Sequence, residues 1–247
     1  MGKFSALLRG ARDKKLFNSA VILASGSGKR FGDDTAKQFL PLAGKPIFIW
    51  SIEAFENSTE IHEIILVTRQ ADIVGCRNLI SEYGLKKVTR VIAGGDTRQQ
   101  SAKIGFDAVN PECDFVAIHD AARCLVTTEM IDMAMSAAYS NGASACASRV
   151  VDTIKRTDVA NNITETIDRE NVWNVQTPQV FMADMYRAAA YTAINDSFTA
   201  TDDCQLCERL GFKVRLVDCG KTNIKITYPE DMIIAKAVLD YRKTEEK

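Results

Sequence analysis

Residues 23–39 read LASGSGKRFGDDTAKQF, so glycine and positive charge are concentrated in one loop directly after the apolar segment SAVI. Glycines let backbone N–H groups approach an anion closely, and Lys29, Arg30 and Lys37 can surround a polyphosphate with charge. A solvated basic loop is the alternative that these residues alone leave open. The loop is therefore a candidate for binding a polyphosphate.

Two well-defined phosphate-binding fingerprints do not fit this loop. The Rossmann fingerprint needs G-x-G-x-x-G, but Gly26, Gly28 and Gly32 are spaced one residue too far apart. The Walker loop needs a glycine five residues before Gly28 and Ser or Thr after its lysine, and the chain has Leu23 and Arg30 there. The loop must belong to another phosphate-binding pattern, if it binds phosphate at all.

The motif HDAAR places Asp120 at the end of an apolar run. A carboxylate in such a place is costly unless it binds a cation or a charged partner. One Mg²⁺ held by a single carboxylate and substrate phosphates would suit it, whereas an ion pair with Arg123 is the structural alternative. We expect His119 to be a packed residue at a strand end rather than a catalytic base, because chemistry between two phosphates requires no strong proton acceptor.

The motif GGDTRQQS, residues 94–101, is a third polar cluster. Gly94 and Gly95 permit close approach to a flat ligand, while Asp96 and Ser101 offer groups suited to a base and a ribose. The same residues also fit the first turn of a helix with Asp96 as its N-cap. The sequence leaves both interpretations open.

Four continuous apolar runs predict buried strands at residues 19–24, 63–68, 88–93 and 115–120. Helical patterns lie between them. One contains Pro46 and an apolar stripe of Phe48, Ile52 and Phe55; another, TTEMIDMAMSAA, has a stripe predicted from Met130, Met133, Ala134 and Ala137. This alternation predicts an α/β fold with a mostly parallel twisted sheet. Ligands bind outside the carboxyl ends of such strands, where all the motifs above fall.

The later part of the chain departs from this alternation. Two strand-like runs flank TDVANN, which predicts a protruding β-hairpin arm at about 148–172 that packs on a second copy in a homodimer. We then expect a helix near 183–195, a second from about 201 closed by Gly211, the strands KVRLVD and NIKIT, and a terminal helix from Pro229. The prediction is one domain, 18–242, with an N-terminal extension at 1–17.

Composition limits the class of partner. The net charge of −1 gives no case for nucleic acid or an anionic membrane, and no apolar run approaches the length that spans a bilayer. Seven scattered cysteines suit reduced, packed thiols in a cytoplasmic protein. Cys204 and Cys207 form one CxxC pair, but a zinc site would need a second pair or nearby histidines.

The chain resembles the 2-C-methyl-D-erythritol 4-phosphate cytidylyltransferases of the non-mevalonate isoprenoid pathway. The resemblance covers roughly residues 18–240 and rests on an ordered series: ASGSGKRF, AKQFLPLAGKPI, GGDTRQQS, HDAAR, VVDTIKR, WNVQTPQVF, TDD and NIKITYPED. It implies a nucleotide-diphospho-sugar-transferase-like (Rossmann-like) fold with a dimer arm. It also implies transfer of a cytidylyl group from CTP to methylerythritol phosphate, with Mg²⁺ and release of pyrophosphate.

The resemblance also assigns roles to residues. Three catalytic cations would act on the phosphates: Arg30, Lys37 and Lys225. The nucleotide would contact Gly26, Gly28, Gly95, Asp96, Ser101 and Ala121, and Asp120 would hold the metal. The polyol phosphate would bind Arg123, Thr153, Arg169 and Thr201, with Thr153 and Arg169 acting across the dimer interface.

Two alternatives stay open at this point. Ribitol-5-phosphate cytidylyltransferase, which would make CDP-ribitol, shares most of these motifs, although HDAAR and NIKIT favour the methylerythritol enzyme. A catalytically silent nucleotide-binding protein could use the same fold, because fold alone does not fix function. Charge on both sides of the α-phosphate argues against a mere binder.

Overall fold

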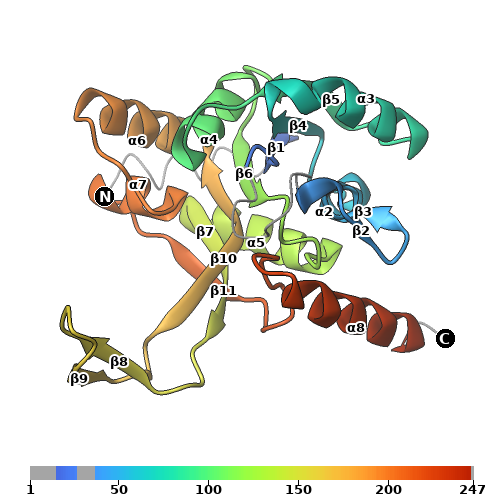
Figure 1. Cartoon of the computed structure of the whole chain (residues 1–247). Helices are drawn as coiled ribbons and strands as arrows, with labels where there is room; N and C mark the ends of the chain where they lie inside the picture. The colour runs from blue at the N-terminus through green and yellow to red at the C-terminus, as the bar shows by residue number, and fades with distance from the viewer. Residues whose placement is uncertain (1–14, 27–36, 246–247) are drawn as a thin grey trace.

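The computed structural model describes residues 15–26 and 37–245, which fold around one seven-stranded sheet (Figure 1). The strand order is β11-β7-β10-β6-β1-β4-β5. The strands are β1 (Asn18–Leu23), β4 (Glu63–Thr68), β5 (Val88–Ala93), β6 (Phe115–Asp120), β7 (Ala143–Arg149), β10 (Trp173–Met182) and β11 (Arg215–Asp218). Only β10 among them runs antiparallel to its neighbours, so the prediction of a mostly parallel sheet is confirmed.

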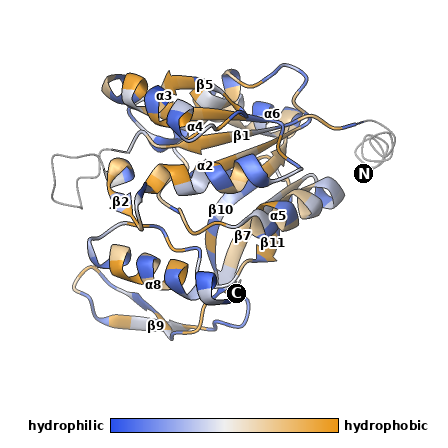
Figure 2. Cartoon of the chain, turned by 90° about the vertical axis from the view of Figure 1, so that its right-hand side faces the viewer, coloured by the Kyte–Doolittle hydropathy of each residue, from blue (hydrophilic) through white to orange (hydrophobic). Residues whose placement is uncertain are grey.

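The apolar runs form central strands because both faces of the sheet are covered. All six residues of β1 are buried, with Ile22 in the core on one face and Val21 in the core on the other. β4 and β6 are buried along their whole lengths in the same way. In Figure 2 the strands of the central sheet are accordingly coloured mainly as hydrophobic.

The helices cover these two faces. Apolar side chains of α2 (Ile47–Asn57), α3 (Ile73–Glu82) and α5 (Thr128–Asn141) pack on one face, and those of α4 (Arg98–Asp107), α6 (Ala183–Asn195) and α7 (Asp203–Arg209) pack on the other. The helix α8 (Glu230–Glu245) packs in a third cluster with Leu42 and Leu125. Short elements complete the described chain: η2 (Lys37–Phe39), β2 (Pro41–Leu42), β3 (Lys45–Pro46) and η3 (Gln70–Asp72).

Two details of the sequence prediction are wrong. Met133 is 46% exposed, and the buried stripe of α5 is Ile131, Ala134, Met135 and Ala138, because the helix presents a different face to the sheet from the one predicted. The run NIKIT is not a strand. Its backbone crosses the carboxyl edge of the sheet, where the Ile226 N–H donates to the Ala122 carbonyl at 2.8 Å instead of joining a ladder.

The predicted arm is confirmed as a β-hairpin of β8 (Ile154–Thr157) and β9 (Ile163–Ile167), which projects from the body of the molecule in Figure 1. Asp158 closes its turn by accepting hydrogen bonds from the backbone N–H groups of Ala160 and Asn162 at 2.9 Å each. Val159 and Ile163 are exposed on the arm. The dimer through this arm stays a prediction.

In the described part of the chain, no helix combines the length and the apolar character that a membrane crossing requires. The seven cysteines are all buried and unpaired. Cys204 and Cys207 lie within α7, where burial raises the pKa of the Cys207 thiol to about 12. These thiols therefore belong to the core.

Candidate active site

Asp120 ends β6, and its carboxylate forms two ion pairs at the carboxyl edge of the sheet. Its Oδ1 accepts from Arg98 Nε at 2.9 Å and its Oδ2 from Lys225 Nζ at 2.6 Å. Burial alone would raise the pKa of Asp120, but the two cations hold it well below its usual range. The alternative that Asp120 pairs with Arg123 is wrong, since its ion pairs are with Arg98 and Lys225.

His119 is a packed strand-end residue, as predicted. Its side chain is fully buried, its Nδ1 lies 3.0 Å from Thr177 Oγ1, and its ring lies 5.0 Å from that of Phe55. Burial lowers the pKa of His119 to about 3. Thr177 Oγ1 also accepts the Asp120 N–H at 3.1 Å, so β10 fixes the backbone that carries Asp120.

A bulge in β10 brings Thr177 to this position. Pairing with β7 is regular up to Val175 and resumes only at Gln179. Within the interruption, the Gln176 Oε1 and the Thr177 carbonyl accept from Asn223 Nδ2 at 3.1 and 2.9 Å. The bulge thus holds the segment that carries Lys225.

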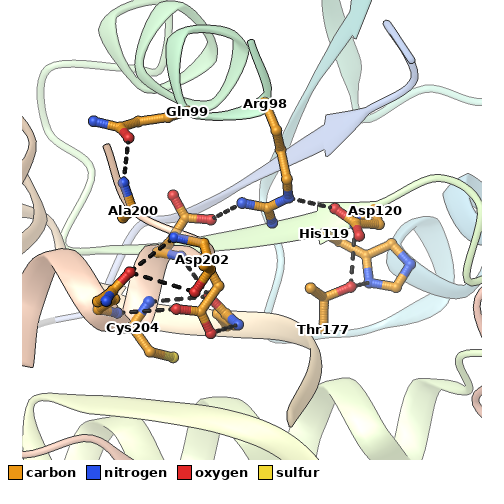
Figure 3. Close-up of polar contacts among 12 residues, drawn as sticks. Arg98, Gln99, His119, Asp120, Thr177, Ala200, Asp202 and Cys204 are labelled. Carbon is orange, nitrogen blue, oxygen red and sulfur yellow. Dashed lines mark hydrogen bonds and ion pairs between the residues drawn. The ribbon is translucent and has the colours of Figure 1, made fainter. Parts of the chain in front are cut away.

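Arg98 is the main residue of the site that sequence reasoning missed. It begins α4, and its Nη1 donates to Asp203 Oδ2 at 2.7 Å while its Nε holds Asp120 (Figure 3). Both residues lie in motifs of the sequence: the cation Arg98 in GGDTRQQS and the carboxylate Asp203 in TDD. Nothing in the sequence indicated that they meet, because residues 98 and 203 are far apart along the chain.

The turn before α4 depends on its glycines. A Cβ on Gly94 would lie 2.6 Å from Ser101 Oγ, and one on Gly95 would lie 2.7 Å from Gln100 Cβ. Ser101 is buried and its Oγ accepts the Gly95 N–H at 3.2 Å. The two glycines therefore let the turn pack closely against the start of α4 and against Ser25, whose Oγ lies 3.0 Å from that of Ser101.

Asp96 is exposed, and the alternative that it caps α4 is wrong by one residue. Thr97 is the N-cap, and it forms a capping box with Gln100. Thr97 takes this position because its extended backbone lets its hydroxyl accept the Gln100 N–H. The Asp96 side chain thus makes no capping bond to α4.

Of the remaining residues that were predicted to bind the nucleotide or its phosphates, the structure describes only some. Gly26 is exposed after β1, and buried Ala121 donates its N–H to the Leu23 carbonyl at 3.0 Å. Gly28 and Arg30 lie outside the described residues, as does the side chain of Lys37 at the start of η2. Their predicted roles stay predictions.

A cavity of about 440 Å³ opens beside Lys225. Four cationic side chains line it: Arg123, Arg149, Lys221 and Lys225. Burial lowers the pKa of Arg123, whose Nη1 donates to the Asn223 carbonyl at 2.9 Å and whose buried Nε has no partner among the described residues. The cavity suits an anion, and sequence reasoning missed Arg149 and Lys221.

Three predicted substrate residues lie away from Asp120. Thr153 and Arg169 are exposed at the base of the arm, where Arg169 Nη1 donates to the Val151 carbonyl. Thr201 is exposed just before α7, and its N–H donates to Gln205 Oε1 at 2.8 Å. The three residues do not themselves line the cavity, although Asp152 and Ile154 on either side of Thr153 do, as does Val151, which Arg169 contacts.

Asp120 fits a magnesium site in which substrate phosphates supply further ligands. Across residues 15–26 and 37–245, no three His, Cys, Asp or Glu side chains cluster to make an all-protein metal site. Mg²⁺ commonly needs only one or two carboxylates when phosphates supply further ligands. Both Asp120 oxygens face cations, but the Lys225 side chain is 40% exposed and free to turn away, so Oδ2 can take a metal.

A mostly parallel α/β sheet with a glycine-lined, cation-rich carboxyl edge is the arrangement of a nucleotide-binding transferase. Among such transferases, the chain belongs to the 2-C-methyl-D-erythritol 4-phosphate cytidylyltransferase family, whose model matches residues 19–241.

Comparison with individual proteins supports the same family. The chain is 43% identical over 222 residues to the 2-C-methyl-D-erythritol 4-phosphate cytidylyltransferase of Caldanaerobacter subterraneus subsp. tengcongensis, covering 90% of this chain and 98% of that protein. It is 40% identical over 230 residues to the enzyme of the same name from Alkaliphilus metalliredigens, covering 93% and 95%.

A solved structure agrees as well. The crystal structure of 4-diphosphocytidyl-2C-methyl-D-erythritol synthase from Anaerococcus prevotii matches with a TM-score of 0.81 at 32% identity, over 91% of this chain and 99% of that one. The prediction of the family and of its fold is confirmed.

Proposed function

We propose that this protein transfers a cytidylyl group from CTP to 2-C-methyl-D-erythritol 4-phosphate and releases pyrophosphate. The observation that carries the proposal is the carboxyl edge of the sheet, where Asp120 and Lys225 meet beside a cationic cavity. The family match over residues 19–241 supports the same reaction. It does not favour ribitol phosphate as the acceptor or a silent nucleotide-binding protein.

The chemistry requires positioning and charge neutralisation rather than a covalent enzyme intermediate. A phosphate oxygen of the acceptor attacks the α-phosphorus of CTP in line, and pyrophosphate leaves. In our assignment Lys225 leaves Asp120 to face the α-phosphate, while Arg30 and Lys37 face the triphosphate from the opening loop. The bare backbone at Gly95, with Asp96 and Ser101, receives the cytosine and ribose.

We assign Mg²⁺ to Asp120, where the ion would neutralise charge on the triphosphate. The position of Asp120 supports this assignment because its Oδ2 contacts Lys225, whose side chain is 40% exposed and can leave the carboxylate. We assign the acceptor phosphate to Arg123, whose unpartnered Nε suits an anion.

We further propose that the protein is a cytoplasmic homodimer. The exposed apolar side chains on the arm and the buried, unpaired cysteines support these two assignments. Thr153 and Arg169, which lie on the arm, would then reach the acceptor in the partner subunit, and Thr201 would reach it from the same subunit.

Pyrophosphate release tests the proposal directly. The protein is incubated with CTP and Mg²⁺, and methylerythritol 4-phosphate and ribitol 5-phosphate are supplied separately. We expect release with the first acceptor alone. Release with ribitol phosphate alone would move the protein to that branch, and tight CTP binding with no release from either acceptor would support a silent binding protein.

A further inference from the structure

Arg98 joins two carboxylates that come from different parts of the fold. Its Nε contacts Asp120 at the end of β6, and its Nη1 contacts Asp203 in the first turn of α7 (Figure 3). The chemistry proposed above uses Asp120 but gives Arg98 and Asp203 no task. A half-buried arginine between two carboxylates, one of them 1% exposed, is costly to desolvate, so the cluster calls for a reason.

Asp203 is held rigidly. It is 1% exposed, its Oδ1 accepts from the Tyr186 hydroxyl at 2.7 Å, and its N–H donates to Gln179 Oε1 at 3.0 Å. Tyr186 is itself fully buried, and Gln179 lies on β10. Arg98 is therefore fixed at one end by the core, and this fixes its other end against Asp120.

The charges of this cluster explain why two carboxylates are needed. Arg98 carries one positive charge, which Asp120 and Asp203 share. With Arg98 alone, Asp120 would be neutralised and would attract a metal ion less strongly. With Asp203 present, the three groups together keep one negative charge, which Lys225 balances until it turns toward the substrate.

The geometry directs that charge to one oxygen. Arg98 occupies Oδ1 of Asp120, and the hydroxyl of Thr177 fixes the backbone N–H of the same residue. Oδ2 faces the exposed Lys225 and the open edge. Arg98 thus selects both the rotamer of Asp120 and the oxygen that is available to a cation.

Arg98 also stands between two predicted binding segments. It follows the Gly94–Gly95 turn, and the next residue, Gln99, donates to the Phe198 carbonyl at 3.0 Å and accepts the Ala200 N–H at 2.9 Å. The start of α4 is in this way attached to the segment that precedes Thr201. Movement of Arg98 would disturb both.

We propose that Arg98 is a positioning residue that, balanced by Asp203, holds the Asp120 carboxylate ready for the metal–nucleotide complex. This inference rests on the proposed function, because it takes Asp120 as the metal ligand.

The test is Mn²⁺ binding in the presence of CTP and without acceptor, measured by the relaxation of water protons. The variants are Arg98→Met, Arg98→Lys and Asp203→Asn. We expect half-saturation of Arg98→Met to need at least about tenfold more Mn²⁺, as for losses of groups that orient metal ligands. Arg98→Lys should recover part of the loss, because one ammonium reaches one of the two carboxylates. Asp203→Asn should also weaken binding, because Arg98 then neutralises Asp120.

The matched control is Arg209→Met, which removes an arginine–aspartate ion pair between α7 and Asp196 without touching Asp120. It should leave Mn²⁺ binding unchanged. If Arg98→Met fails to fold because Asp203 is left buried and unpaired, the double variant with Asp203→Asn removes that charge. The double variant should still bind Mn²⁺ weakly, because Oδ1 of Asp120 has then lost the contact that fixes the rotamer of this side chain.

Equal Mn²⁺ half-saturation in the wild type and in folded Arg98→Met or the double variant would overturn the inference. Normal Mn²⁺ and CTP binding by the wild type without pyrophosphate release from any acceptor would overturn the proposed reaction alone. A wild type that binds no Mn²⁺ with CTP would overturn both.

Discussion

At the residue scale, Lys225 contacts one negative charge in the structure and would face a second one in the proposed reaction. In the structure its ammonium lies 2.6 Å from Asp120 Oδ2, and in the proposed reaction it faces the α-phosphate. Its side chain is 40% exposed, so the exchange needs no rearrangement of the core. In the proposed reaction, the ion pair is thus the resting position of Lys225.

Replacing Lys225 by alanine should lower kcat for pyrophosphate release on the order of 100-fold, because one preorganised charge at the transition state is lost. Lys37→Ala should behave in the same way. The measurement is turnover at saturating CTP and acceptor. Lys236→Ala, which removes an exposed ion pair on α8, is the control and should be near wild type. Near-normal turnover of Lys225→Ala would remove this residue from the mechanism.

Single residues were predicted from the sequence where their type restricts what they can do. Asp120 after an apolar run needed a cation, and the structure supplies two. Arg98 was missed because an arginine in a polar motif has many possible partners. Asp203 was missed for a related reason, since its burial depends on Tyr186 and Gln179, which other elements contribute.

At the element scale, the packing of α4 on the sheet depends on how closely the two approach each other. Helix α4 lies so near the sheet that a Cβ on Gly105 would lie 2.3 Å from Val21 Cγ1 and 2.8 Å from Val67 Cγ2. Both valines belong to central, fully buried strands. The distance between α4 and the sheet, and with it the position of Arg98, depends on this glycine.

Gly105→Ala should therefore lower the free energy of unfolding by about 1–3 kcal/mol through overpacking. The measurement is urea denaturation. Gly75→Ala in α3 is the matched control, because a Cβ there meets nothing within 4 Å. It should raise stability by up to about 1 kcal/mol through helix propensity. A stabilised Gly105→Ala would show that α4 can move away from the sheet without cost.

Elements were predictable where periodicity alone determines them. The runs at 63–68 and 115–120 are strands because only a sheet covered on both faces buries such continuous apolar segments. The run at 88–93 is a strand too, but it lies at the edge of the sheet and only Val91 is buried, so the prediction of a buried strand is wrong there. NIKIT alternates like a strand, yet its backbone partner is the loop after β6 and its Asn223 side chain bonds to β10. Alternation describes side chains and cannot report which backbone groups are available for pairing.

At the scale of the whole molecule, the arm would link the site to assembly in the proposed dimer. Arg169 lies on the arm and Lys225 at the sheet edge, so a dimer in which arms cross would combine residues of two chains in each site. Arg169→Ala and Lys225→Ala should each lose activity alone. Co-expressed with different tags, they should recover about a quarter of wild-type activity, since about half of the dimers are mixed and each has one intact site.

The matched control pairs Lys225→Ala with Asp120→Asn, because both residues belong to the same subunit's site and no mixed dimer then has an intact one. Light scattering checks that each preparation is dimeric. Activity of the Arg169/Lys225 mixture that merely equals the mean of the separate variants would contradict an arm that acts across the interface.

The position of the segment around Asn223 late in the chain has a consequence for folding during synthesis. It is synthesised after all seven described strands of the sheet, yet it fastens the bulge of β10 and carries Lys225. A growing chain on the ribosome can therefore complete its sheet while the carboxyl edge still lacks this cation and the closure that Asn223 provides. The carboxyl edge of the sheet is therefore completed only after its strands have been made, shortly before α8 is added.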